Sequence, residues 1–339
     1  MEFVRLGIIG CGGRLKAHVK GIANRENCRV VAVADPIEER RLAAAKLFGC
    51  EAIYKDGAEL LDHAKGNIDA LLICVEPPSH GNMELRAVEL GIPFLVEKPM
   101  SNDLEYTEKV ARAVEESGLI TSVGFQDRYL DLTEIIRDEL PKHKRGGIVY
   151  GSWIGGIPGP WWWQKKEYCG GQLVEQNIHL LDELRYLFGE PLSIYATASR
   201  GMITPGVGCS EEYDSDDHST TVIRFKNSVT ATLTSGCYIK RGVSMRGRLG
   251  LYMVLEDIIL DYRLRNNLII ETDAEKRDIP RGMDQTAALD QAFIEAVRTG
   301  DRSLIRSDYA DAMKSLRLAF AANKSMESGQ VIYFEEDEK

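Results

Sequence analysis

The chain has 339 residues, which is too long for one ordinary domain, so two domains are the natural expectation. Hydrophobic residues make up 44% and charged residues 28%, as in a typical globular protein with ample core. The net charge of -10 argues against nucleic acid or an anionic membrane as a partner, and no apolar run reaches membrane-spanning length.

Two further features bear on the cellular location. The first strand pattern begins by Phe3, which leaves no room for a signal peptide. The seven cysteines are scattered and include no C-x-x-C pair. We therefore expect reduced thiols, no metal site and a cytoplasmic protein.

Strand and helix patterns alternate over the first third of the chain. Strand patterns cover 3–9, 29–35, 69–75, 92–97 and 119–124. Helical patterns between them include 37–48 and 101–117, the second beginning at the cap residue Ser101. This alternation predicts an α/β fold, with a doubly wound parallel Rossmann sheet forming a dinucleotide-binding domain over residues 1–124.

After residue 124 the pattern changes. Helices are expected near 131–139, 171–188, 284–299 and 307–327, the last two capped at Asp284 and Ser307 and stopped at Gly300 and Gly329. Strand patterns lie at 147–154, 192–199, 218–225, 229–237, 249–255 and 268–272. They predict a second α/β domain over 125–339 with an open, mostly antiparallel sheet, ending in an acidic tail that frays.

The most informative stretch is 7–35, GIIGCGGRLKAHVKGIANRENCRVVAVAD. Gly10 lets the chain turn sharply off the first strand, and Gly12 lets a pyrophosphate approach the backbone at the helix N-terminus. Asp35 ends the second strand, where a carboxylate can accept hydrogen bonds from both ribose hydroxyls of NAD. Leu15 stands where the third glycine of G-x-G-x-x-G belongs, so we expect looser packing of this helix on the first strand. The remaining candidates to contact the cofactor in this turn are Gly13 and Arg14.

Two later strands end in residues that suit ligand binding. The strand over 69–75 runs into Glu76, Pro77 and His80 at the carboxyl edge of the sheet, where open α/β sheets bind ligands. A rigid turn that starts a helix is the alternative for this segment. The strand over 92–97 runs into Glu97 and Lys98. A lysine there can bind a substrate hydroxyl or carbonyl, although a solvated charge is the commoner role.

A third segment, 170–182, starts with two glycines and continues as a predicted helix. Glu175, His179, Asp182 and Tyr186 share one helical face, so an acid one turn before a histidine could orient it and raise its basicity. An ordinary surface helix would also have a polar face. Just upstream, three tryptophans follow one another at 161–163 in a Gly/Pro loop. They either fill the gap between domains or form a wall for the nicotinamide or a platform for a sugar ring.

The chain resembles the glucose–fructose oxidoreductase / inositol dehydrogenase / rhizopine catabolism (Gfo/Idh/MocA) family. The resemblance is carried by GIIGCGG, the Asp35 strand end, EKP at 97–99, VGFQDR at 123–128 and GGQLVEQNIHLLDELRYLFG at 170–189. It implies that Lys98 matches the EKP lysine, with a cis bond to Pro99, and that His179 matches the catalytic histidine. Glu175 stands where the family usually has aspartate, and Asn177 where it usually has glycine. The other predicted cofactor contacts are Gln126, which lies in VGFQDR, and Trp162, which lies in the tryptophan loop.

These observations predict an NAD-dependent oxidoreductase, with NADP possible, acting on a sugar, polyol or sugar derivative. Lys98, His179 and Glu175 are the expected catalytic residues. An NAD-dependent glycosidase that uses transient oxidation and a non-catalytic dinucleotide-binding regulator are the alternatives. The threonine-rich face of the strands at 218–225 and 229–237 predicts a homodimer or homotetramer.

Overall fold

The computed structural model describes every residue except 24, 145, 241–242, 244–247 and 335–339, so the acidic tail predicted to fray lies outside it. The chain forms two compact units. Unit 1 comprises Met1–Tyr129 and Asp284–Met313, and unit 2 comprises Leu130–Met283 and Lys314–Lys339. The sequence pattern places one boundary at 124/125, whereas here the chain passes between units three times.

Unit 1 is built on a parallel sheet of six strands in the order β3-β2-β1-β4-β5-β6, which confirms the Rossmann prediction. The strands are β1 Val4–Ile9, β2 Cys28–Ala34, β3 Ala52–Tyr54, β4 Ala70–Ile73, β5 Phe94–Val96 and β6 Thr121–Val123. The sequence pattern missed β3 because three residues are too few to show a period. Strands β1 and β4 are buried on both faces, as expected for the centre of a parallel sheet.

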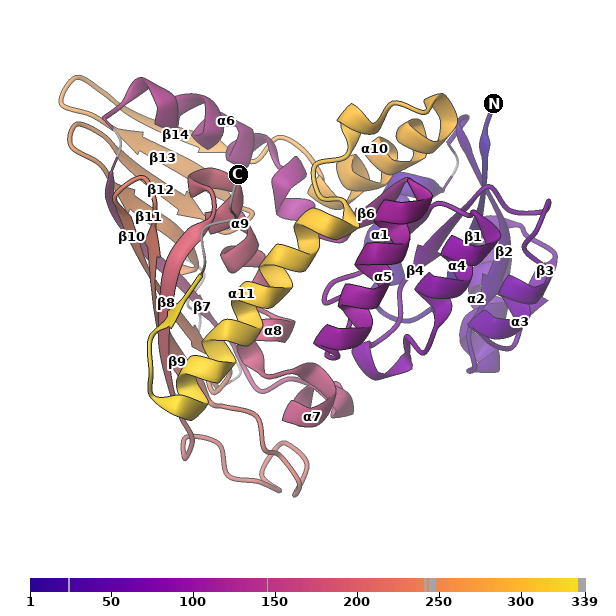
Figure 1. Cartoon of the computed structure of the whole chain (residues 1–339), viewed down its shortest axis with the longest axis horizontal. Coiled ribbons are helices and arrows are strands. Elements are labelled where there is room, and N and C mark those ends of the chain that lie inside the picture. Colours follow the sequence, from indigo (N-terminus) through magenta and orange to yellow (C-terminus); the bar gives the residue numbers. More distant parts are fainter. Residues whose placement is uncertain (24, 145, 241–242, 244–247, 335–339) are drawn as a thin grey trace. The chain divides into compact units, whose positions relative to one another are not determined.

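Helices flank this sheet (Figure 1). They are α1 Leu15–Ile22, α2 Glu38–Phe48, α3 Gly57–Asp62, α4 Met83–Leu90, α5 Leu104–Ser117 and α10 Gln285–Thr299, with single turns η1 Pro77–Ser79, η2 Gln126–Tyr129 and η6 Arg302–Leu304. The predicted cap of α5 is wrong by two residues: the Asp103 side chain accepts from the Tyr106 N–H, while Ser101 Oγ accepts from the Asp103 N–H. Asp284 caps α10 as predicted, accepting from the Thr286 and Ala287 N–H groups.

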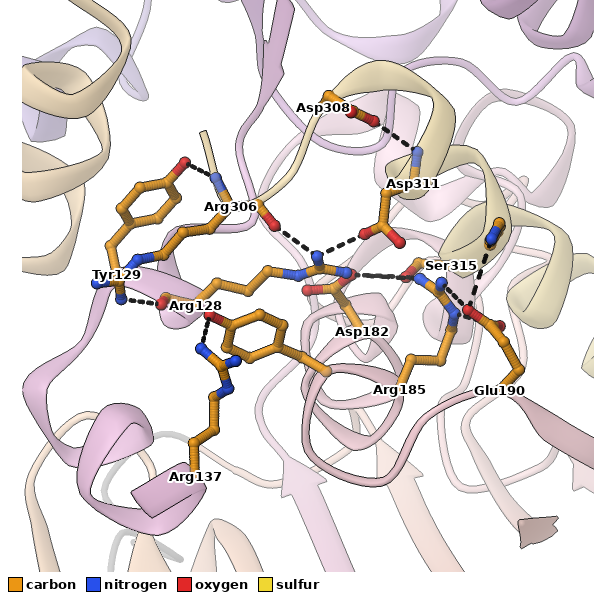
Figure 2. Close-up of polar contacts among 12 residues, drawn as sticks. Arg128, Tyr129, Arg137, Asp182, Arg185, Glu190, Arg306, Asp308, Asp311 and Ser315 are labelled. Atoms are coloured by element: carbon orange, nitrogen blue, oxygen red, sulfur yellow. Dashed lines mark hydrogen bonds and ion pairs between the residues drawn. The ribbon is translucent and has the colours of Figure 1, made fainter. Parts of the chain in front are cut away.

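The late segment Asp284–Met313 returns to unit 1 because α10 packs along α1 and because the following loop is tied to η2. The Arg306 N–H donates to the Tyr129 hydroxyl at 2.8 Å, and Arg128 Nη1 donates to the Arg306 carbonyl at 2.6 Å (Figure 2). Arg128 also pairs with Asp311 at 2.5 Å. A hydrophobic pattern cannot reveal such long-range polar contacts.

Unit 2 is built on a nine-stranded sheet in the order β14-β13-β12-β11-β7-β10-β9-β8-β15. Its strands are β7 Gly147–Ile154, β8 Pro191–Ser199, β9 His218–Phe225, β10 Val229–Gly236, β11 Gly250–Val254, β12 Ile259–Arg263, β13 Asn267–Glu271, β14 Lys276–Pro280 and β15 Ile332–Tyr333. Strands β7 and β10 pair in parallel and the other pairs are antiparallel, as predicted. The pattern missed β12, β14 and β15, which are short and interrupted by charge or lie at sheet edges.

The helices of unit 2 lie on one face of this sheet (Figure 1). They are α6 Asp131–Glu139, α7 Lys166–Cys169, α8 Gln172–Glu175 and α9 Ile178–Phe188, with turns η3 Leu140–Lys142 and η4 Trp161–Gln164. Helix α11, Tyr309–Ser328, begins in unit 1 and continues in unit 2. Its first turn is closed by Asp308, whose side chain accepts from the Asp311 N–H at 2.8 Å, so the Ser307 cap is wrong by one residue.

The two faces of the large sheet differ in composition. Along one face, the strands bury residues such as Ile194, Ile223 and Leu233 under the helices. Along the other, register aligns Tyr150 with Tyr252 on one neighbour and with Thr232 on the other. Tyr150 is 52% exposed and Tyr252 39% exposed. The face predicted to be rich in threonine therefore also carries exposed tyrosines.

All seven cysteines fall in the described part of the chain and none forms a disulfide. No helix among the residues the structure describes is long and apolar enough to cross a membrane. Within the same residues, no group of three His, Cys, Asp or Glu side chains is placed to hold a metal ion.

Candidate active site

The glycine-rich turn follows β1 in unit 1. Gly10 has φ +92°, and a Cβ there would lie 2.4 Å from the Cys74 carbonyl oxygen, so the position requires glycine. A Cβ on Gly12 would come no nearer than 3.8 Å to Arg40 Nη1, and one on Gly13 would meet no described atom within 4 Å. The backbone of Gly12 and Gly13 therefore borders open space at the start of α1, which fits the approach of a pyrophosphate.

Leu15, in place of the third glycine, is the first residue of α1 and is buried in the core of unit 1. Arg14 precedes it, and its guanidinium contacts Glu97 at 2.8 Å.

Asp35 lies directly after β2 at the carboxyl edge of the sheet. Its two carboxylate oxygens accept hydrogen bonds from the Cys11 N–H and the Ile37 N–H, both at 2.8 Å. The carboxylate thus connects the glycine-rich turn to the start of α2 and is held in a fixed orientation. Arg41 Nη1 lies 3.4 Å from the Asp35 carbonyl oxygen, so one cation stands beside the acid. These residues fit the ribose and pyrophosphate of NAD.

The segment after β4 forms the single turn η1. Glu76 precedes this turn, Pro77 is buried within it, and His80 follows it. His80 is 2% exposed and its Nδ1 contacts the Glu84 carboxylate, whose other oxygen accepts from the Tyr106 hydroxyl at 2.9 Å. These contacts show how a rigid turn is built there. Contact of Glu76, Pro77 or His80 with the cofactor stays a prediction.

The segment after β5 carries Glu97 and Lys98, and the Lys98–Pro99 peptide bond is cis, as predicted. Glu97 is 4% exposed; its Oε1 accepts from Arg14 at 2.8 Å and contacts His18 Nε2 at 2.9 Å, and its Oε2 accepts from the Lys98 N–H at 3.2 Å. Burial would raise the pKa of Glu97, but the charge of Arg14 and the contact with His18 hold that pKa well below its usual range. Glu97 is therefore an ionised anchor for the backbone of Lys98.

His179 lies in the first turn of α9 in unit 2. The prediction of one helix over 171–188 is wrong, because the chain breaks at Gln176 and Asn177 between α8 and α9. Glu175 ends α8, so it and His179 do not share the face of a continuous helix. The imidazole of His179 instead stacks on the indole of Trp153 from β7, with ring centroids 5.8 Å apart and planes 21° apart.

Of the rest of the predicted polar face, Asp182 is buried and Tyr186 is half-buried, and the contacts of Asp182 and of the nearby Arg185 lie within unit 2 (Figure 2). Asp182 Oδ1 accepts from the Ser315 hydroxyl at 2.6 Å, and Arg185 donates to that same hydroxyl at 2.6 Å. Arg185 also binds Glu190 through two nitrogens, at 2.6 and 3.0 Å. Helix α9 is therefore an internal helix rather than an ordinary surface helix.

The remaining candidates fall in both units. Gln126 begins η2 of unit 1 and is buried. Trp162 lies in η4 of unit 2 and stacks on Trp163, with centroids 5.9 Å apart, while Trp163 Nε1 donates to Gln172 Oε1 at 3.0 Å. Trp161 is 61% exposed. Sequence reasoning missed Trp153 and His18, because the partner of each lies far away in the sequence.

One family model matches a segment of unit 1, and a second matches a segment of unit 2. The model described as "Oxidoreductase family, NAD-binding Rossmann fold" matches residues 4–125, and that described as "GFO/IDH/MocA C-terminal domain" matches residues 145–250. The chain belongs to the Gfo/Idh/MocA family. This chain is accordingly an oxidoreductase with an NAD-binding Rossmann domain.

Curated and solved members of the Gfo/Idh/MocA family align over nearly the whole chain. A scyllo-inositol 2-dehydrogenase (NAD(+)) of Bacillus subtilis is 25% identical over 97% of this chain and 96% of its own. A myo-inositol 2-dehydrogenase of Thermotoga maritima is 22% identical over 98% and 99%. An oxidoreductase from Agrobacterium radiobacter, solved with NAD+, L-tartaric acid and magnesium, has a TM-score of 0.83 at 18% identity, covering 98% of both chains. At 18% identity, the similarity to the Agrobacterium radiobacter structure is evidence for the fold alone.

Proposed function

We propose that this protein is an NAD-dependent dehydrogenase that oxidises a CH–OH group of a polyol, sugar or sugar derivative. The observation that carries the proposal is the carboxyl edge of the unit 1 sheet. There the open glycine-rich turn, the oriented Asp35 carboxylate and the anchored Lys98 backbone follow β1, β2 and β5. The names of the full-length relatives, which are inositol dehydrogenases, support the substrate class.

In this proposal His179 takes the proton from the substrate hydroxyl, and Lys98 donates a hydrogen bond to the same oxygen. The lysine stabilises negative charge that develops on that oxygen as the C–H bond breaks. NAD supplies the hydride acceptor. The stack with Trp153 limits rotation of the imidazole, so His179 presents its ring in one orientation. We propose that Glu175, at the end of α8, helps to orient His179.

A substrate panel followed at the NADH absorbance tests the proposal. It contains inositols, sugars, polyols and sugar acids. We expect K98A and H179A each to lower turnover on the best substrate by about a hundredfold or more, the usual scale for a positioned acid–base group. H63A and K46A change residues on the outside of unit 1 and serve as matched controls.

Other outcomes would point elsewhere. Release of an aglycone with no net NADH would favour an NAD-dependent glycosidase. NAD binding without turnover of any compound in the panel would favour a regulator. Near-normal turnover by H179A would remove the histidine from the mechanism.

We also propose that two copies pair through the open face of the unit 2 sheet. Tyr150 and Tyr252 lie on the neighbouring strands β7 and β11, and Tyr195 lies further along the sheet on β8. All three are more than a third exposed, and a tyrosine-rich face is typical of interfaces. A closed twofold pair is the commonest use of such a surface. Light scattering at micromolar concentration should give at least twice the chain mass of 37.9 kDa, and Y150D should lower it. A wild-type mass near 38 kDa would reject the proposal.

A further inference from the structure

In unit 1, four charged side chains from three segments of the chain form one continuous series of contacts. Asp290 Oδ1 on α10 lies 2.7 Å from His18 Nδ1 on α1, and His18 Nε2 lies 2.9 Å from Glu97 Oε1. Glu97 in turn contacts Arg14 in the glycine-rich turn at 2.8 Å. His18 has no exposed surface, and Asp290 and Glu97 are 2% and 4% exposed. The series joins the start of the chain to a helix 272 residues away.

The two contacts of the imidazole determine its charge. A neutral histidine donates from one ring nitrogen and accepts at the other, so one nitrogen would face a carboxylate oxygen without a proton between them. Donation to both carboxylates requires the imidazolium. The four groups then alternate as two cations and two anions with no net charge, which is the condition under which charges are tolerated in a core.

The direction of the pKa shift of His18 agrees with this charge state. Burial acts to lower the pKa of His18, but the charge and hydrogen bond of Asp290 and the contact with Glu97 outweigh it and hold that pKa well above the usual value. Burial also raises the pKa of Asp290, but we place the proton on the ring because a second carboxylate faces its other nitrogen. The groups that face His18 are Asp290, Glu97, Arg14 and the Cys74 thiol.

The backbone is packed tightly around the two carboxylates. A Cβ on Gly21 would lie 2.2 Å from Asp290 Oδ2, and a Cβ on Gly124 would lie 2.8 Å from the Glu97 carboxylate. Helix α1 and the turn after β6 therefore leave just enough room for the acids. A side chain at either glycine would displace the charge that it touches.

We propose that His18, held by Asp290, is a positioning residue for the redox site: it fixes Glu97, which holds both the glycine-rich turn through Arg14 and the backbone of Lys98. This inference rests on the proposed function for the role of Lys98. The cofactor turn and the lysine then share one anchor. Loss of the His18 charge loosens both together, so NAD affinity and turnover fall in parallel.

The first experiment reads the charge of His18 directly in the unaltered protein. Nitrogen-15 NMR distinguishes an imidazolium from a neutral ring, and H18Q, or through-space contacts in labelled protein, assigns the signal among the six histidines. We expect the His18 ring to stay doubly protonated at pH 8, where a histidine of ordinary pKa near 6.5 is neutral. A neutral His18 ring at pH 8 overturns the proposal, whatever reaction the enzyme performs.

The second experiment compares D290N with E295Q. Both remove a carboxylate from α10, but Glu295 bonds with Asn27 and Arg298, outside the Glu97 series. We expect D290N to weaken NAD binding, measured by fluorescence titration, by about tenfold and to lower turnover by a similar factor, the scale seen when a residue that orients a functional group is lost. For E295Q, NAD affinity and turnover should each stay within about twofold of the wild-type values.

The pH dependence separates positioning from a merely structural role. His18 of D290N keeps one carboxylate partner, so its pKa falls and NAD affinity should decline at a lower pH than in the wild type. A structural defect would lower affinity by the same factor at every pH. Parallel pH profiles for wild type and D290N would therefore reject the inference. Because NAD binding needs no substrate, this readout stands even if the proposed reaction proves wrong, and if D290N does not fold, the NMR measurement decides.

Discussion

The surroundings of Lys98 and of His179 differ in the forces that fix them. In unit 1, the Lys98 backbone is bound to Glu97, which takes part in a series of four charges that is buried except at Arg14. In unit 2, His179 lies against the indole of Trp153 and begins a helix whose buried polar residues are bonded further along. The backbone of Lys98 is therefore fixed through charged contacts, whereas the ring of His179 is fixed by aromatic packing.

This difference determines how each region should respond to change. Removal of one member of an ion series in a core is strongly destabilising, since the remaining charge is left buried and unpaired. A ring stack depends on area and planarity, so a smaller aromatic ring retains part of it. Changes of charge should therefore affect unit 1 most, and changes of shape should affect unit 2 most.

The largest expected effect concerns the charge of Asp35 in unit 1. Its oriented carboxylate would face a 2′-phosphate with like charge, so we expect NAD to bind about a hundredfold more tightly than NADP. Fluorescence titration of both cofactors measures the ratio. The R40A/R41A variant serves as a control, because removing two cations that lie close to Asp35 in the sequence should widen the preference. Equal or tighter NADP binding by the wild type would contradict the fixed-charge description.

The next effect tests the space around Asp290. G21A places a methyl group against the carboxylate and should lower the free energy of unfolding by about 1–3 kcal/mol, the usual cost of overpacking a core. Chemical denaturation measures the change. G159A is the matched control, since a Cβ there meets no described atom within 4 Å. A G21A protein as stable as wild type would show that the carboxylate has room to move.

A smaller effect is expected from the stack in unit 2. W153A removes the ring against His179 and should lower turnover by about two- to tenfold, since such ring pairs contribute about 0.5–1.5 kcal/mol. W153F keeps an aromatic face and should recover most of the loss. NAD affinity, measured separately, should hardly change. If W153F and W153A were equally impaired, shape would not be what holds the histidine.

The smallest effect is the pH dependence of stability. The pKa of His18 is raised in the folded protein, so its contribution is complete below about pH 6.5 and declines as the pH rises toward the folded value. The pKa of Glu97 is lowered, so its contribution is complete above about pH 4.3 and is lost as the pH falls. The difference in unfolding free energy between wild type and H18Q should be largest between these limits. If the difference in unfolding free energy between wild type and H18Q grew above pH 8, the raised pKa of His18 would be contradicted.

Local patterns in the sequence predicted much of this structure. The strand, turn, helix, strand and acid of residues 7–35 lie within one short segment, and hydrophobic period and glycine placement suffice to describe it. The same holds for the strand that ends at Lys98. Even the alternation in β9 and β10 identified their buried and open faces.

The features that escaped prediction depend on distant partners. No local signal pairs His18 with Asp290, because the fold alone brings α1 and α10 together. The helix breaks before His179 at Gln176 and Asn177, and neither position is a glycine or a proline. The hydrophobic pattern therefore predicted one uninterrupted helix across the break. The stack of Trp153 on His179 likewise joins a strand to a helix. The sequence therefore named candidate residues for the site more readily than it named the residues that hold them in place.

The interleaving of the two units along the chain has a consequence for protein engineering. Unit 1 needs both Met1–Tyr129 and Asp284–Met313, and α11 is divided between the units. A fragment that stops at Tyr129 would retain His18 but lose Asp290, leaving an imidazolium with a single carboxylate partner. Chimeras between relatives must therefore exchange the first and the late segment as a set, and a library that recombines them freely will be enriched in mismatched cores.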